Sequence, residues 1–173
     1  KEYDTAGLIE LLGGWLDHYP IVSVEDPLAE DDHGGMKAFT EAFGERVQII
    51  GDDYLVTNAG RVTEAAACGI CNAALIKLNQ AGTVSETRAA VEAAKAAGWG
   101  TIVSARSGET EDTTIAHLAV GWNAGQLKVG SFARSERMAK WNEVLRIEET
   151  LGDQAVLTSS FSSPLGKGVR VRG

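Results

Sequence analysis

Thr-Ile-Val-Ser-Ala-Arg-Ser-Gly-Glu-Thr-Glu-Asp, residues 101–112, is the segment most informative about the fold. Its β-branched apolar start, residues 101–103, is followed at once by polar residues, which indicates a buried strand whose end opens onto a site. Arg106 offers a planar set of donors suited to phosphate or carboxylate, and Ser104 and Ser107 add hydroxyl groups beside it. The segment therefore predicts a strand that delivers anion-binding groups to its carboxyl end.

A second interpretation of the same segment is an ordinary loop between a strand and a helix. In that case Arg106 pairs with Glu109 or Glu111, and no ligand is involved. Gly108 fits both interpretations, because a glycine lets the backbone turn or approach a ligand closely. The segment alone leaves the anion site and the structural ion pair equally open.

Similar apolar runs recur on both sides of this segment. The predicted strands are residues 21–24, 47–50, 73–76, 101–103 and 125–130. The predicted helices, from apolar periodicity and capping residues, are 5–18, 36–43, 58–68, 83–97, 113–122 and 135–151. Each strand ends at or near one of five charged residues: Glu25, Asp52, Lys77, Arg106 and Lys128. Alternation of strand and helix predicts an α/β fold with a parallel sheet.

The spacing of these five charged residues, 22 to 29 residues, is close to that of a parallel barrel. A (β/α)₈ barrel uses about 31 residues per unit and places its chemistry at the carboxyl ends of its strands. A doubly wound open sheet shows the same alternation, so periodicity alone does not choose between them. The sequence contains no Gly-x-Gly-x-x-Gly opening a helix and no P-loop, which disfavours nucleotide binding.

Composition limits the possible functions. The chain has 173 residues, 44% of them hydrophobic, which is enough for one domain with a sizeable core. A net charge of −8 argues against nucleic acid or an anionic membrane as the main partner. No apolar run has the length of a membrane span and no signal peptide is visible. The chain starts at Lys1 rather than Met, which fits a fragment of a longer protein.

Two cysteines, Cys68 and Cys71, form a Cys-Gly-Ile-Cys pair. A redox or metal role is possible for such a pair, but no second pair completes a zinc site. Their place in an alanine-rich helical stretch favours a reduced, partly buried pair. This fits a cytoplasmic protein.

Glu25 and Asp52 are acidic residues at the ends of neighbouring predicted strands. Carboxylates so placed suit Mg²⁺, which takes one or two of them together with water and substrate oxygens. The alternative is that each one caps a helix or pairs with a lysine. Asp26 and Asp53 are supporting or capping groups as readily as ligands. The acidic run at residues 30–33 is expected to be a solvated loop.

Lys77 ends an entirely apolar predicted strand, which is an unusual position for a free lysine. Burial near another cation, such as Lys128, lowers the affinity of a lysine for its proton. A neutral lysine can remove a proton α to a carboxylate while metal ions hold the developing charge. The structural alternative is a salt bridge from Lys77 to Glu25 or Asp52.

The segment at 104–112 is similar to the Ser-His-Arg-Ser-Gly-Glu-Thr-Glu-Asp signature of the enolase (phosphopyruvate hydratase) family, except that Ala105 replaces the histidine. Further blocks resemble enolase in the same order: 22–27, 48–53 with 56–58, 75–80, 125–128, 134–137 and 145–149. The resemblance covers about residues 1–156 and implies the C-terminal portion of an enolase-type parallel barrel, with about five of eight strand–helix units. Residues 157–173 have no counterpart and are predicted to be a poorly ordered tail.

The resemblance also implies roles for matching residues. Glu25 and Asp52 would be two of three carboxylate ligands of Mg²⁺. Lys77 would take the C2 proton of 2-phosphoglycerate, and Lys128, a second catalytic residue, would contact the substrate carboxylate. Arg106 with Ser107 would hold the phosphate. The implied reaction is the glycolytic, Mg²⁺-dependent dehydration of 2-phosphoglycerate to phosphoenolpyruvate.

Three hypotheses follow from the resemblance. The chain is the barrel portion of an enolase lyase whose third metal ligand and catalytic glutamates lie upstream, or it is a catalytically impaired enolase-like scaffold or binding protein. Ala105 and the missing ligands favour the second, whereas the retained charged residues favour the first. Another acid lyase or racemase is disfavoured by the specific signature. Five strands cannot close an eight-stranded barrel, so we expect a homo-oligomer or a complementary chain.

Overall fold

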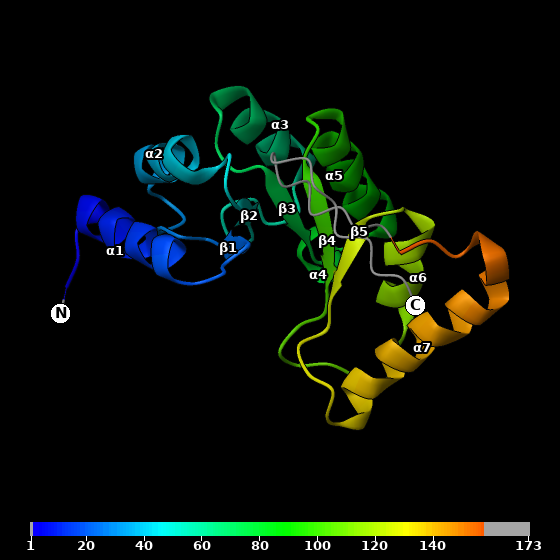
Figure 1. Ribbon diagram of the computed structural model, residues 1–173. Coiled ribbons are helices and arrows are strands. Elements are labelled where there is room, and N and C mark those ends of the chain that lie inside the picture. Colours follow the sequence, from blue (N-terminus) through cyan, green and yellow to red (C-terminus); the bar gives the residue numbers. More distant parts are fainter. Residues whose placement is uncertain (1, 158–173) are drawn as a thin grey trace.

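Five parallel strands lie side by side in chain order, and helices connect them (Figure 1). The computed structural model describes residues 2–157 of the chain. The strands are β1 (Ser23–Glu25), β2 (Gln48–Gly51), β3 (Ala73–Ile76), β4 (Gly100–Ser104) and β5 (Gly125–Lys128). Each neighbouring pair is parallel. The predicted α/β class with a parallel sheet is confirmed.

The helices follow the predicted pattern closely. They are α1 (Thr5–His18), α2 (His33–Phe43), α3 (Ala59–Cys68), α4 (Leu78–Ala81), α5 (Val84–Ala96), α6 (Thr114–Gly121) and α7 (Ser135–Leu151), followed by a 3₁₀ turn, η1 (Gly152–Gln154). The predicted bounds of α1, α7 and β3 are those observed. The first strand begins two residues later than predicted, at Ser23, and the short helix α4 was not predicted.

Capping residues start the helices where the sequence places them. The Asn58 side chain accepts a hydrogen bond from the Arg61 amide at 3.0 Å and begins α3. Thr83 accepts from the Glu86 amide at 3.2 Å and begins α5. The run 30–33 was expected to be a solvated loop, but Asp32 accepts from the Gly35 amide at 2.7 Å and caps α2, which begins at His33, three residues before the predicted start. A hydrogen bond from Thr5 lowers the pKa of Asp32.

Both faces of the three central strands, β2 to β4, are buried. Alternate strand residues such as Ile49, Ile76 and Val103 join the large core beneath the helices. The residues between them form a second, smaller cluster on the opposite face: Ile50, Ala73, Leu75 and Ile102. Near-continuous apolar strands are typical of parallel sheets covered on both faces, and an inner cluster drawn from successive strands is typical of a barrel interior.

The sheet is curled into part of a barrel. Its order, β1 to β5 without reversal, lacks the switch point of a doubly wound sheet. Lys128, at the end of β5, contacts Glu25, at the end of β1, so the two outermost strands approach each other at their carboxyl ends. Figure 1 shows helices α3, α5 and α6 around the outside of this curl. The described part of the chain is therefore an incomplete α/β barrel of five strands.

None of the helices within residues 2–157 is long and apolar enough to cross a membrane. The predicted poorly ordered tail, residues 157–173, lies outside the described residues except for Leu157.

Candidate active site

The carboxyl ends of the five strands bring the predicted site residues together. Each strand delivers a charged residue at its last position or within two residues after it: Glu25 on β1, Asp52 after β2, Lys77 after β3, Arg106 after β4 and Lys128 on β5. Parallel strands share one edge for their carboxyl ends, which is why residues separated by a hundred positions meet there. We call this edge the rim.

Asp52 and Lys77 form a buried ion pair on the rim. The Lys77 ammonium donates to Asp52 Oδ2, and the side chains are only 12% and 9% exposed for Lys77 and Asp52 respectively. Gln80 Nε2 donates to the other oxygen of Asp52 at 3.1 Å. The Thr57 hydroxyl accepts from the Lys77 amide at 3.0 Å and fixes the backbone where the strand ends. The predicted salt bridge between Lys77 and Asp52 is therefore present.

Asp26 supports the backbone beside this pair. Its carboxylate accepts hydrogen bonds from the amides of Asp52 and Asp53 at 2.9 and 2.8 Å. Its own backbone adopts a positive φ of 39°, a conformation that is uncommon for a residue other than glycine. Burial raises the pKa of Asp26, against the opposing effect of the two hydrogen bonds. Asp26 thus has the supporting role that the sequence left open, while Asp53 is exposed.

Glu25 and Lys128 form a second ion pair, which is more open to solvent. Lys128 Nζ lies 2.8 Å from Glu25 Oε1 and 2.5 Å from Oε2. The side chains are 46% exposed for Lys128 and 32% exposed for Glu25. The structural alternative from sequence was a salt bridge between Glu25 and Lys77. In the structure the lysine that pairs with Glu25 is Lys128.

The Arg106 guanidinium does not pair with Glu109 or Glu111, the two partners considered from sequence. It donates to Asn79 Oδ1, just after β3, at 2.9 Å. Glu109 instead accepts a hydrogen bond from the Arg106 backbone amide at 2.7 Å and pairs with Lys140 at 2.7 Å. The ordinary-loop interpretation was wrong in this respect, because a buried lysine from α7 competes for the carboxylate.

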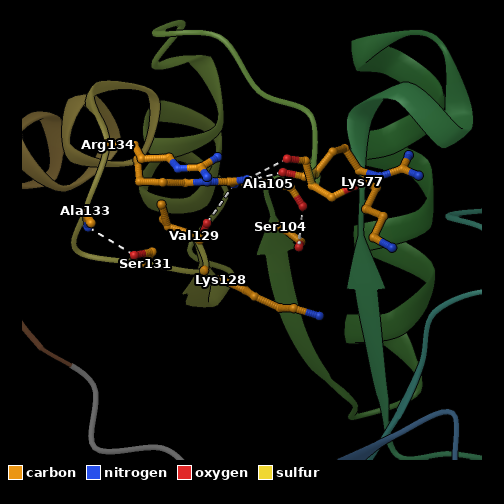
Figure 2. Close-up of a pocket in the computed structure, with 12 residues that line it drawn as sticks. Lys77, Ser104, Ala105, Lys128, Val129, Ser131, Ala133 and Arg134 are labelled. Carbon is orange, nitrogen blue, oxygen red and sulfur yellow. Dashed lines mark hydrogen bonds between the residues drawn. The ribbon is translucent and has the colours of Figure 1, made fainter.

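A cavity of about 580 Å³ lies over the rim and is rich in cations. Four predicted site residues line it: Lys77, Arg106, Ser107 and Lys128. Figure 2 shows Lys77 and Lys128 extending from their strand ends into the same space. Sequence reasoning assigned no role to Ser131, Arg134 and Arg137, which also line it. The sequence indicated Arg134 and Arg137 only as part of the enolase-like block at 134–137, and that resemblance assigned them no role.

Ala105 lines the same cavity and is 8% exposed. Its amide donates to the Lys128 carbonyl at 2.9 Å, so the backbone here continues the pairing of β4 with β5. Figure 2 shows Ala105 between the Lys77 side and the Lys128 side of the cavity. The position that carries a polar ring in the similar signature therefore presents only a methyl group to this space.

A family model described as "Enolase, C-terminal TIM barrel domain" matches residues 1–163 of the chain. The chain belongs to this enolase family. Membership agrees with the incomplete parallel barrel and makes the enolase-type lyases the class of enzyme to which the domain is related.

The carboxylates of this enolase domain are of the type that Mg²⁺ prefers, but they are too few to bind the ion without water or substrate. Within residues 2–157 no group of three or more His, Cys, Asp or Glu side chains is arranged to hold a metal ion. Glu25 and Asp52 supply two carboxylates from adjacent strands. Mg²⁺ commonly takes one or two carboxylates and completes its shell with water and substrate oxygens. The residues present therefore fit such an ion, provided that the paired lysines turn away.

The cysteines of the enolase domain lie away from this chemistry. Both are free thiols, with Cys68 exposed and Cys71 buried, as predicted for a reduced pair. Burial raises the pKa of Cys71 to about 12, which disfavours the reactive thiolate.

Proposed function

We propose that this domain carries the substrate-binding and proton-removing part of an enolase, the Mg²⁺-dependent lyase that converts 2-phosphoglycerate to phosphoenolpyruvate. The main support is the arrangement of the rim. Lys77, Arg106, Ser107 and Lys128 line one cavity, and the carboxylates Glu25 and Asp52 pair with its two lysines. Such a cavity suits a small dianionic or trianionic acid.

The proposed roles follow from the chemistry of each group. Arg106 and Ser107 hold the phosphate through a planar guanidinium and a hydroxyl. Lys128 binds the substrate carboxylate. Lys77 in its neutral form accepts the proton from C2, and the electrons of the C–H bond pass toward the carboxylate.

Mg²⁺, held by Glu25 and Asp52, would stabilise the negative charge that develops on that carboxylate. The C3 hydroxyl then leaves as water, and the double bond forms between C2 and C3. We assign no residue of the described chain to the proton that this departure requires. In this proposal acidic groups from a longer or complementary chain supply it, in a cytoplasmic setting.

A catalytically impaired enolase-like scaffold or binding protein is the second candidate. It is favoured by Ala105, which leaves the cavity without the imidazole of the similar signature, and by the engagement of both lysines in ion pairs. Loss of one positioned polar group commonly costs about 10²–10³-fold in rate. Such a protein would still bind the phosphorylated acid without turning it over.

Exchange of the C2 proton of 2-phosphoglycerate in D₂O with Mg²⁺, followed by NMR, tests the first step by itself. We expect measurable exchange with the native chain and a loss of at least about 10²-fold with Lys77→Met. Lys37→Met is the matched control, since that lysine is 51% exposed on α2 and forms a surface ion pair with Glu41. Exchange that persists in folded Lys77→Met would remove Lys77 from the mechanism.

Formation of phosphoenolpyruvate by the native chain and by Ala105→His separates the two candidates. The lyase proposal predicts that the imidazole raises turnover by about 10²–10³-fold. If both C2 proton exchange and turnover are absent from both proteins but Mg²⁺ and substrate raise the melting temperature, the binding protein is favoured. If neither ligand raises it, both candidates fail.

A further inference from the structure

Lys140 on α7 is a buried lysine that the proposed chemistry does not use. Its side chain is 0% exposed, which is rare for lysine. The ammonium lies 2.7 Å from Glu109 Oε2 and donates to the Thr110 carbonyl at 2.6 Å and the Glu136 carbonyl at 3.0 Å. All three of its protons are therefore engaged, and two of the partners lie on the loop after β4.

Glu109 connects Lys140 to the rim. One of its oxygens faces Lys140, and the other accepts a hydrogen bond from the Arg106 amide at 2.7 Å. The link therefore runs from α7 through one carboxylate to the backbone of Arg106. A charge-assisted hydrogen bond of this kind is short and directional, so it fixes where the Arg106 backbone lies.

Arg137, one turn earlier on α7, holds the same loop from a second direction. Its Nη1 donates to the carbonyls of Arg106 at 2.8 Å and Val129 at 2.9 Å, and its Nη2 donates to the Ser107 carbonyl at 2.9 Å. Val129 directly follows Lys128. A single planar guanidinium therefore fixes the loop after β4 to the end of β5, a geometry that lysine could not reproduce.

We infer that Lys140 and Arg137 are positioning residues, through which α7 holds Arg106 and Ser107 in place for an anionic group of the ligand. The inference rests on the proposed function for the identity of that ligand, a phosphorylated acid. Lys140 is fully buried and cannot touch a ligand in the cavity, so its effect must pass through Glu109 and Arg106. Replacing a buried ion pair with apolar residues is often neutral for stability, which makes stability alone a weak explanation for it.

The test compares the affinities of the native chain and Lys140→Met for 2-phosphoglycerate with Mg²⁺, measured by titration calorimetry. Misplacing a hydrogen bond to a charged group costs about tenfold or more in affinity, and we expect weakening of about 10–10²-fold. Affinity for Mg²⁺ alone, which depends on Glu25 and Asp52 at the other side of the rim, should stay within about twofold. A merely structural role would weaken both affinities together. Lys37→Met is the surface control.

The double variant Glu109→Met/Lys140→Met serves if the single variant does not fold, because it leaves no buried charge unpaired. Hydrogen exchange of the Arg106 amide, read by NMR, should be faster in it than in the native chain, with weakened substrate binding. Unchanged substrate affinity in a folded variant would overturn this inference and leave the proposed function standing. Failure of the native chain to bind 2-phosphoglycerate would overturn the proposed function and the role inferred here with it.

Discussion

The two lysine–carboxylate pairs on the rim look alike in chemistry and differ in setting. Asp52 and Lys77 come from neighbouring strands, with side chains 9% and 12% exposed. Glu25 and Lys128 come from the first and last strands, with side chains 32% and 46% exposed. The first pair is enclosed by the fold, and the second bridges its two outermost strands.

The supports of the two carboxylates differ in the same way. Asp52 also accepts a hydrogen bond from Gln80, and Asp26 holds its backbone amide. The Glu25 carboxylate is held by the ammonium of Lys128. We therefore expect the β2–β3 side of the rim, which we call the platform, to be the more rigid one, and the contact between β1 and β5 to open at lower cost.

Asp52→Asn should produce the largest effect. The substitution leaves the Lys77 ammonium largely buried without its charged partner, and breaking a buried pair in this way costs about 3–5 kcal/mol. Chemical denaturation followed by circular dichroism would measure the loss in free energy of unfolding. Asp53→Asn is the matched control, because Asp53 is adjacent in sequence to Asp52 but is itself exposed. A cost below about 1 kcal/mol for Asp52→Asn would mean that the platform is not rigid.

Gly51→Ala tests the packing of the same platform without changing any charge. A Cβ at Gly51 would lie 2.6 Å from Leu55 Cγ and 3.2 Å from Cys71 Sγ, and Leu55 is completely buried. Overpacking of this kind costs about 1–3 kcal/mol, and we expect the same denaturation experiment to show it.

Gly14→Ala on α1 is the control for that substitution. Nothing lies within 4 Å of the position of its Cβ, so alanine there should stabilise the helix by about 0.5–1 kcal/mol. Equal behaviour of the two variants would contradict the tight packing behind Asp52.

Much of this architecture was predictable because its signals are local. Residues 73–76 form a continuous apolar run, and residues 135–151 carry apolar side chains at helical spacing. Neither signal needs tertiary context, and the bounds of both elements were predicted as observed. The meeting of Glu25 with Lys128 was predictable only in outline. Strand–helix alternation places both at one edge, but the choice between a barrel and a doubly wound sheet depends on strand order, which periodicity does not contain.

The partners of individual side chains were less predictable because they depend on distant segments. Lys140 reaches Glu109 and Thr110 from about thirty residues away, and no pattern near Arg106 indicates that a lysine will compete for that carboxylate. The same holds for Asp26, whose supporting role depends on the amides of Asp52 and Asp53. Sequence patterns fix which groups reach the rim, whereas packing decides how they pair there.

Glu25→Gln should cause the smallest loss in the free energy of unfolding, and it tests most directly how the two ion pairs differ. An ion pair this exposed contributes about 0–1 kcal/mol, and raising the salt concentration from about 0.1 M to about 1 M should remove most of that contribution. The loss caused by Asp52→Asn should persist at high salt, because buried charges are screened much less.

Mg²⁺ should raise the melting temperature of the native chain more than that of Glu25→Gln, since the variant loses one carboxylate ligand. A loss above about 2 kcal/mol that salt does not reduce would show instead that the contact between β1 and β5 is as structural as the buried pair, and that the cavity does not open there.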